Sequence, residues 1–309
     1  MGRENRVVIL GVFVADTAYR ADRAPKMGET ILGRSFKLGP GGKGSNQAVA
    51  AARLGAEVGF ITRLGRDPFA DMAFATWKEA GVTPAVTQTA DSYTGAAYIF
   101  IEEATGDNAI IICPGAAADI APADLDARAG LIAGAAVFVT QLEQPLEAAV
   151  RGLEIARANG VTTILNPAPG RELPDSVLAL CDYLTPNETE AEALTGLPVA
   201  DEDAARAAAE RLRERGVGTV VITLGARGAL LHGHGRSALV PAIDAGPVVE
   251  TTGAGDAFNG GFATALARGM DPWEAVRFGC ATAGISVTRP GTAPSMPTLA
   301  EVEALLARS

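Results

Sequence analysis

The sequence predicts an α/β domain whose mostly parallel sheet is covered by helices on both faces. From about Ala121 onward, short continuous apolar runs alternate with segments whose apolar residues recur at helical spacing. Strands buried on both faces of a parallel sheet have such continuous apolar runs. We find no internal repeat, low-complexity tract or linker, so we expect one domain over residues 1–309, interrupted by a smaller β element.

The first part of the chain contains this smaller β element. In order, we expect a buried strand over 7–15, a polar and strand-prone stretch over 16–37, a helix over 44–54 and a strand over 58–62. Residues 95–101 and 109–112 are strand-like and are joined by the turn Gly106-Asp107-Asn108, which predicts a hairpin.

In the second part, polar residues follow the predicted strands. Strands are expected over 136–140, 162–166 and 219–223, with helices between them. Their carboxyl ends carry Gln141 with Glu143, then Asn166, then Thr223. Ligands of open α/β sheets bind at these ends, so we expect a site there.

Composition, charge and cysteine use exclude several classes of protein. The chain is 48% hydrophobic and 20% charged, which is typical of a globular protein. The net charge of −10 and the absence of a dense Lys/Arg run disfavour a nucleic-acid partner. The first apolar run is too short for a membrane span and continues into motif sequence, so we expect a cytoplasmic protein. Cys113, Cys181 and Cys280 lie far apart in apolar or strand-like surroundings, so we expect buried, reduced thiols.

Residues 251–258 (TTGAGDAF) carry the most specific signal. Small residues at 253–255 let backbone N–H groups crowd one point, and Asp256 stands where an apolar helix begins. Such a turn can bind an anion while the acid accepts a proton from a neighbouring hydroxyl. An acid that only satisfies free N–H groups of the helix is the alternative, but it leaves the small residues unexplained.

Residues 39–44 (GPGGKG) form a second glycine-rich turn before a helix. They match the dinucleotide-binding spacing, but Pro40 and a polar stretch precede them in place of the tight strand-turn-helix context. A Walker loop is excluded because Gly44 stands where Ser or Thr is needed. A turn that only packs remains possible, but polar residues at the helix start favour a small polar ligand: Lys43, Ser45, Asn46 and Gln47. Together the two turns suggest phosphoryl transfer to a small alcohol.

Two further motifs have structural and functional interpretations. Asn187 and Glu190 have the spacing of a capping box, and the same residues can present an amide and a carboxylate to Mg²⁺-bound water and phosphate. Both roles are compatible. His232 and His234 lack supporting Cys or carboxylate ligands, so polarity of a turn between strands is favoured over metal binding.

The motifs, in this order, resemble those of the ribokinase-like carbohydrate kinase family nearly from end to end. The matching segments are GETILG at 28–33, GPGGKGSNQAVAAARLGA at 39–56, QLEQPLE at 141–147, LNPAPGRELPD at 165–175, TPNETEAEALTG at 185–196, VITLGARGA at 221–229, TTGAGDAFNGG at 251–261 and VTRPGTAPSMP at 287–297. The resemblance implies a three-layer core with a nine-stranded type of sheet. It also implies a small β lid, over about 13–38 and 94–113, that often forms a dimer contact, so we expect a homodimer.

The resemblance also implies a role for each site residue. Sugar hydroxyls would be bound by Asp16, Gly42, Lys43, Asn46 and Glu143. Asp256 would take the proton from the attacking hydroxyl, and Gly253, Ala254 and Gly255 would form the anion hole. Asn187 and Glu190 would organise Mg²⁺ and the phosphates, Glu190 through water, while ATP would be lined by Thr223, Gly225, Gly228 and Gly255. A monovalent cation, K⁺, would fall to Glu250, Thr252, Ser286, Arg289, Gly291 and Ser295, partly through carbonyls.

Two residues depart from the family pattern. Val14 stands where an Asn usually binds a sugar hydroxyl, and Glu250 stands where the cation segment usually begins with Asp. The activity implied is ATP-dependent, Mg²⁺-assisted phosphorylation of a pentose at its primary hydroxyl, with D-ribose O5 as the first expectation. The alternatives are a kinase for deoxyribose, a ketohexose or a nucleoside, and a catalytically silent sugar-binding protein. Asp256 argues against silence, because a binder needs no base.

Overall fold

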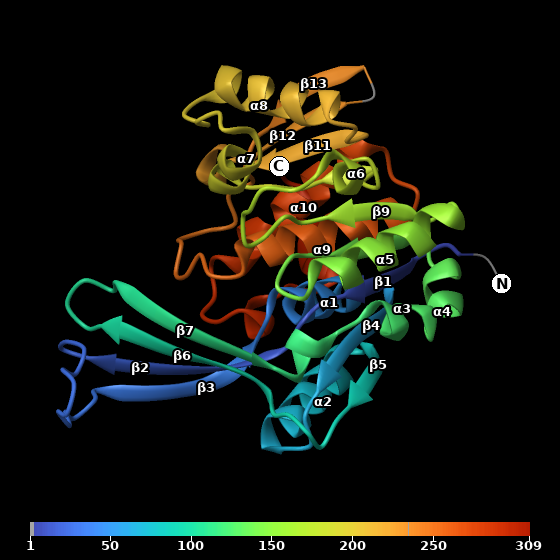
Figure 1. Ribbon diagram of the computed structural model, residues 1–309. Coiled ribbons are helices and arrows are strands. Elements are labelled where there is room, and N and C mark those ends of the chain that lie inside the picture. Colours follow the sequence, from blue (N-terminus) through green and yellow to red (C-terminus); the bar gives the residue numbers. More distant parts are fainter. Residues whose placement is uncertain (1–2, 234) are drawn as a thin grey trace.

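A computed structural model describes residues 3–233 and 235–309 and contains, within them, sheets of nine and four strands (Figure 1). The larger sheet runs in the order β13 (Arg236–Val240), β12 (Ala229–Gly233), β11 (Thr219–Thr223), β10 (Tyr183–Leu184), β9 (Thr162–Leu165), β8 (Val137–Thr140), β1 (Arg6–Leu10), β4 (Glu57–Leu64), β5 (Thr83–Gln88). Neighbouring strands from β5 to β11 are parallel, and β12 is antiparallel to both β11 and β13. The predicted α/β class is confirmed.

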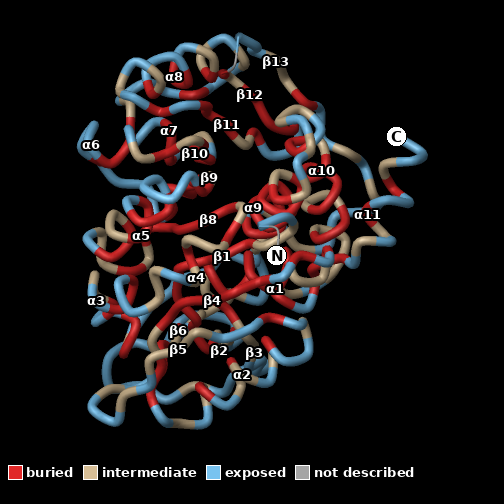
Figure 2. Tube along the Cα trace, turned by 90° about the vertical axis from the view of Figure 1, so that its right-hand side faces the viewer, coloured by how far each residue is buried: buried red, intermediate tan, exposed pale blue. Residues whose placement is uncertain are grey.

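Helices cover both faces of the large sheet. One face packs against α1 (Lys43–Arg53), α2 (Pro68–Ala80), α9 (Ala254–Ala267), α10 (Pro272–Ser286) and α11 (Leu299–Leu306). The other packs against α3 (Pro122–Asp126), α4 (Ala129–Ala133), α5 (Leu146–Ala158), α6 (Asp175–Leu178), α7 (Glu188–Thr195) and α8 (Glu202–Glu214). Side chains of β1 point alternately to the two faces of the sheet, which explains the two helix layers. Val7 and Ile9 belong to one buried cluster, and Val8 and Leu10 belong to the other. Figure 2 shows this buried centre in red.

The smaller sheet, which we call the lid sheet, projects from the core (Figure 1). Its order is β3 (Ser35–Gly41), β2 (Val14–Ala21), β6 (Thr94–Glu102), β7 (Asn108–Gly115). The predicted hairpin is confirmed, because β6 pairs antiparallel with β7. The single strand predicted over 7–15 is wrong: β1 ends at Leu10 and β2 begins at Val14. The break falls at Gly11, where a Cβ would lie 2.6 Å from the Gly44 Cα, so the chain can pass α1 there only without a side chain.

Burial corrects one cysteine prediction. Cys181 and Cys280 are buried and free as expected, but Cys113 is exposed on β7 because the lid sheet leaves this strand open to solvent. Among the described residues, no helix has the length and apolar character needed to cross a membrane.

Strand order creates a topological switch point in the large sheet. The chain proceeds from β1 to β4 and β5 on one side, and β8 lies on the other side of β1. The carboxyl ends of β1 and β8 therefore flank a topological switch point, where open α/β sheets bind ligands.

Candidate active site

The starts of α1 and α9 meet at this switch point. Each helix follows a glycine with positive φ, Gly42 at 89° and Gly253 at 83°, which favours glycine at both turns. The helices cross closely at Gly260, where a Cβ would lie 2.5 Å from the Ala50 Cβ. This crossing brings the polar first turn of α1 against Asp256 of α9.

Asp256 is 6% exposed and hydrogen-bonded on both carboxylate oxygens. Asn46 Nδ2 donates to Oδ2 at 2.9 Å, and Gln47 Nε2 donates to Oδ1 at 3.1 Å. Burial raises the pKa of Asp256, although the Lys43 charge and the two amide donors oppose the rise. Asn46 Oδ1 is buried without a hydrogen-bond partner in the described part of the chain, so it can accept a hydrogen bond from a ligand hydroxyl.

Four further ionisable groups surround this carboxylate. Burial raises the pKa of Glu143 to about 7, and burial together with Asp256 raises that of Asp16 to about 6. Burial alone would lower the pKa of Lys43, but Asp256, Glu143 and Glu190 reverse this and raise it. The Lys43 N–H also donates to Glu143 Oε2 at 2.8 Å. The predicted sugar-binding residues therefore converge from β2, α1 and the loop after β8.

The lid contributes Asp16 through a close approach to the turn before α1. A Cβ on Gly41 would lie 2.2 Å from Asp16 Oδ2, so only glycine leaves room for this carboxylate. Val14 lies two residues earlier on β2, on the same face as Asp16. Its side chain is 5% exposed and packs into the apolar cluster.

The first turn of α9 presents backbone donors. The Ala254 N–H is engaged by the Thr251 carbonyl at 3.1 Å. The N–H groups of Gly255 and Asp256 lie in the first turn, where a helix has no acceptor of its own for them. These groups and the positive end of the helix suit an anion.

Asn187 and Glu190 make the predicted capping box and lie near the other site residues. Asn187 is the N-cap of α7 and makes the full capping box, with Glu190 N to Asn187 Oδ1 at 2.8 Å and Asn187 N to Glu190 Oε2 at 2.9 Å. Glu190 also interacts electrostatically with Lys43 and Asp256, and burial raises its pKa. Asn187 pairs with Thr223 as an isolated parallel bridge, so the predicted nucleotide residues are adjacent. Gly225 and Gly228 follow with φ of 55° and 103°.

The segments assigned to a monovalent cation converge behind α9. The Glu250 N–H donates to Val287 O at 3.1 Å, and Gly291 N–H donates to Glu250 Oε2 at 2.7 Å. Ser286 and Ser295 are each 1% exposed, whereas the Arg289 side chain pairs with Glu301. Thr252 is exposed and directly precedes Gly253, whose missing Cβ would lie 3.4 Å from Thr292. One carboxylate among hydroxyls and carbonyls fits a cation that takes oxygen ligands, and Arg289 would contribute by its backbone.

Several buried amides of the site were given no specific role by sequence. Gln141 and Asn166 were expected only to lie at the ligand-binding ends of their strands, and both contact Gln47, which in turn contacts Asp256. Asn259 of α9 accepts from Thr185 Oγ1 at 2.6 Å and donates to Gly255 O at 2.8 Å. Its polarity in an apolar helix was the available signal.

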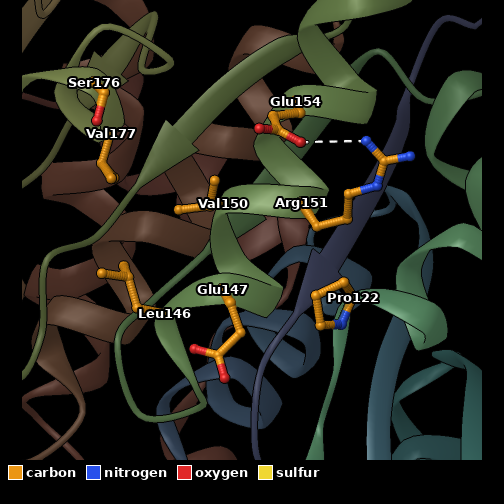
Figure 3. A pocket seen from close by; sticks show the side chains of 8 residues that line it. All are labelled: Pro122, Leu146, Glu147, Val150, Arg151, Glu154, Ser176 and Val177. Carbon is orange, nitrogen blue, oxygen red and sulfur yellow. Dashed lines mark hydrogen bonds and ion pairs between the residues drawn. The ribbon is translucent and has the colours of Figure 1, made fainter.

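Two other features lie apart from these residues. A hollow of about 480 Å³ on the outer side of α5 has the Arg151–Glu154 ion pair in its lining and contains none of the predicted site residues (Figure 3). His232 lies on β12 and contacts Glu210 and Ser237, which supports a structural role. His234 lies outside the described residues. No group of three His, Cys, Asp or Glu side chains suited to a metal occurs among the described residues.

Known proteins are similar to this chain in sequence and in fold. The model of the family described as pfkB family carbohydrate kinase matches residues 4–299. The chain is 40% identical over 296 residues to ribokinase of Haemophilus influenzae, covering 96% of each chain. It is 38% identical to deoxyribokinase of Salmonella typhi, covering 95% of this chain and 96% of that one. The structure of Arabidopsis thaliana ribokinase complexed with ribose and ATP superposes with a TM-score of 0.95 at 32% identity, covering 100% of both chains.

Proposed function

This chain belongs to the pfkB family of carbohydrate kinases, and from that membership we propose that it transfers the γ-phosphoryl group of ATP to O5 of D-ribose. One observation carries the proposal. Asp256 is a buried carboxylate held by two amides at the start of α9, next to backbone N–H groups suited to phosphate and next to Lys43. A protein that only binds sugar has no need of this combination.

We assign roles to the chain's residues from the family resemblance and from their positions around Asp256. Asp16, Lys43, Asn46 and Glu143, with the Gly42 backbone, bind and orient the sugar hydroxyls. Asp256 accepts the O5 proton as the phosphoryl group is transferred. Because that transfer is largely dissociative, the proton leaves late and a carboxylate is a sufficient base. In the anion hole predicted from Gly253, Ala254 and Gly255, the N–H groups of Gly253 and Gly255, together with that of Asp256, donate to the oxygens of the transferred group, because the Ala254 N–H already donates to the Thr251 carbonyl.

Asn187, Glu190, Thr223, Gly225 and Gly228 hold the nucleotide. Oxygen ligands and retained waters suit Mg²⁺, so Glu190 would hold it through water. When bound, Mg²⁺ neutralises charge on the phosphates.

A potassium ion would be held by the converging segments that begin at Glu250 and end at Ser295. Its charge behind α9 would strengthen the N–H donors. We expect K⁺ to raise kcat more than it changes the KM for ATP. Equal rates in K⁺-containing and K⁺-free buffer would remove the cation from the proposal.

Deoxyribose is the second candidate substrate, favoured by Val14 and by the similarity to a deoxyribokinase. A coupled assay of ADP release should compare kcat/KM for ribose, deoxyribose, fructose and a nucleoside. We expect ribose to lead, with a raised KM and measurable deoxyribose activity. Any other sugar leading by about tenfold or more would overturn ribose, and no turnover with any acceptor would favour a silent binder.

The lid sheet is proposed to join two copies of the chain. An apolar face, defined by Tyr19, Phe36, Leu38, Tyr98 and Ile111, is exposed. Tyr19 lies 5.0 Å from Phe36 and 5.4 Å from Tyr98 between ring centroids, and Tyr98 is directly opposite Ile111 in register. Such an exposed aromatic patch is typical of an interface. We place the dimer in the cytoplasm, where ATP and free thiols such as those of this chain occur.

A further inference from the structure

The side chain of Gln47 connects Asp256 to a row of buried amides. Gln47 is 0% exposed, and its Nε2 donates both to Asp256 Oδ1 and to Asn166 Oδ1, each at 3.1 Å. Its Oε1 accepts from Gln141 Nε2 at 2.6 Å. The Gln47 amide is therefore held from three sides and cannot rotate without losing bonds.

Asn166 fixes the direction of these bonds. Its NH₂ donates to the Thr185 carbonyl at 3.0 Å, so its oxygen must face Gln47 and accept from the Gln47 NH₂. The Gln47 NH₂ therefore also points towards Asp256, which is the terminal acceptor, and the Gln47 oxygen is left to accept from Gln141.

The two donors to Asp256 differ in what else they can touch. Asn46 has an unpartnered buried oxygen and, under the proposed function, also contacts sugar. Gln47 is engaged on both of its polar atoms by protein groups. A change at Gln47 should therefore alter the base without removing a sugar contact.

We propose that Gln47 is a positioning residue that keeps Asp256 ionised and oriented to accept the substrate proton. This inference rests on the proposed kinase function. Donation to a carboxylate favours its charged form, which counters the burial that disfavours it. Removal of the Gln47 donor should raise the pKa of Asp256 and leave Asn46 as its one amide donor, so the carboxylate should be ionised over a narrower pH range and be held less firmly.

The test replaces Gln47 with Met, which has a similar length and no donor, and measures kcat, sugar KM and the pH profile of kcat. We expect kcat to fall about 10- to 100-fold while KM changes less than about threefold. The acidic limb of the profile should move to higher pH. Lys43, Asp16, Glu143 and Glu190 also face Asp256 and titrate in both proteins, so the difference between variant and wild type reports the change at Gln47.

Gln144→Met is the matched control. Gln144 is another buried amide, but it donates to the Gln141 carbonyl and to Thr140 Oγ1 and makes no contact with Asp256. A packing effect would lower the melting temperature of both variants, whereas only the Gln47 variant should move the acidic limb. Should Gln47→Met not fold, Gln47→Glu retains the shape and the acceptor for Gln141, and its added carboxylate should shift the limb still further.

The outcomes separate the two proposals. Wild-type turnover with ribose reports the kinase function, and the ratio of variant to wild type reports the role of Gln47. The positioning role would be overturned if Gln47→Met had wild-type kcat and an unchanged acidic limb in its pH profile, or if it raised only the KM for sugar. Either result would leave the kinase function intact.

Discussion

The residues around Asp256 and those of the lid sheet differ in how their side chains are held. Asp256 is 6% exposed and accepts two amide donors, whereas Ile111 of the lid is 63% exposed. A group held from several sides keeps one geometry, and an exposed sheet face is free to meet a partner or to move. The contrast predicts that changes near Asp256 act on kcat and changes in the lid act on assembly and sugar affinity.

The largest effect on activity should come from a change at Asp256 itself. Asp256→Asn keeps the shape but removes the proton acceptor, so we expect kcat to fall about 10²- to 10⁴-fold. Sugar binding, measured by calorimetry, should survive. Asp271→Asn, at the N-cap of α10, is a matched acid at a helix start and should leave kcat near wild type. Wild-type turnover of Asp256→Asn would contradict its role as the base.

The fold was predictable where the pattern was long and local. The apolar runs of β8, β9 and β11 identified a parallel sheet, and the turn at 106–108 identified the lid hairpin. β10 was missed because it has two residues, and β5 because Pro84 interrupts its strand signal. The exposure of Cys113 was missed because a two-faced sheet open to solvent has no sign in its local sequence.

The site was predictable only in part. The sequence singled out Asp256 and residues 39–44 because, in both segments, small residues and a charged residue lie together at the start of a predicted helix. The contacts of Gln47 with Gln141 and Asp256 join residues 94 and 209 positions apart, and strand order decides that they meet. The direction of the pKa change is also tertiary, because burial raises the pKa of Asp256 against the donors around it.

The second prediction tests the exposed region. Ile111→Glu places a charge on the apolar face of the lid and should weaken dimerisation about 30-fold, measured by analytical ultracentrifugation. Sugar KM should rise with little change in kcat. Ile110→Glu is the control, because Ile110 is 52% exposed on the opposite face of the same strand. Weakening by Ile110→Glu alone would assign the interface to the other face, and no effect of either would exclude the lid.

A third change lies where the two regions meet. Val14→Asn restores a hydrogen-bonding side chain on the sugar-facing side of β2, next to Asp16. One added bond is worth about 0.5 to 1.5 kcal/mol, so kcat/KM for ribose should rise about three- to tenfold. Deoxyribose should gain less if it lacks the hydroxyl concerned.

Val14→Ala is the control for this change, because it removes packing without adding a donor. The substitution also buries an amide, so thermal stability must be measured alongside activity. Equal gains for both sugars would mean that position 14 does not read the hydroxyl in which they differ.

The smallest predicted effect is on stability and concerns Glu143, a residue proposed to bind sugar. Burial raises its pKa from 4.5 to about 7, so the native state binds the proton more tightly than the unfolded chain. Stability therefore falls as pH rises from about 4.5 to about 7, and Gln at this position, which cannot ionise, avoids the fall.

Glu143→Gln can still accept the Lys43 N–H, and we expect it to gain roughly 1 kcal/mol of unfolding free energy at pH 8 and almost nothing at pH 4.5. This gain in free energy is smaller than the whole pKa shift would give. Glu143 is only half-buried, and the variant loses the attraction between the Glu143 carboxylate and the Lys43 charge. Urea denaturation at both pH values measures it, with the exposed Glu147→Gln as control. A gain in stability accompanied by weaker ribose binding would show that the Glu143 carboxylate serves ligand binding and destabilises the fold. This outcome is expected for the buried residues around Asp256 and not for the exposed lid sheet. An equal gain at both pH values would point to packing and would contradict the electrostatic cause.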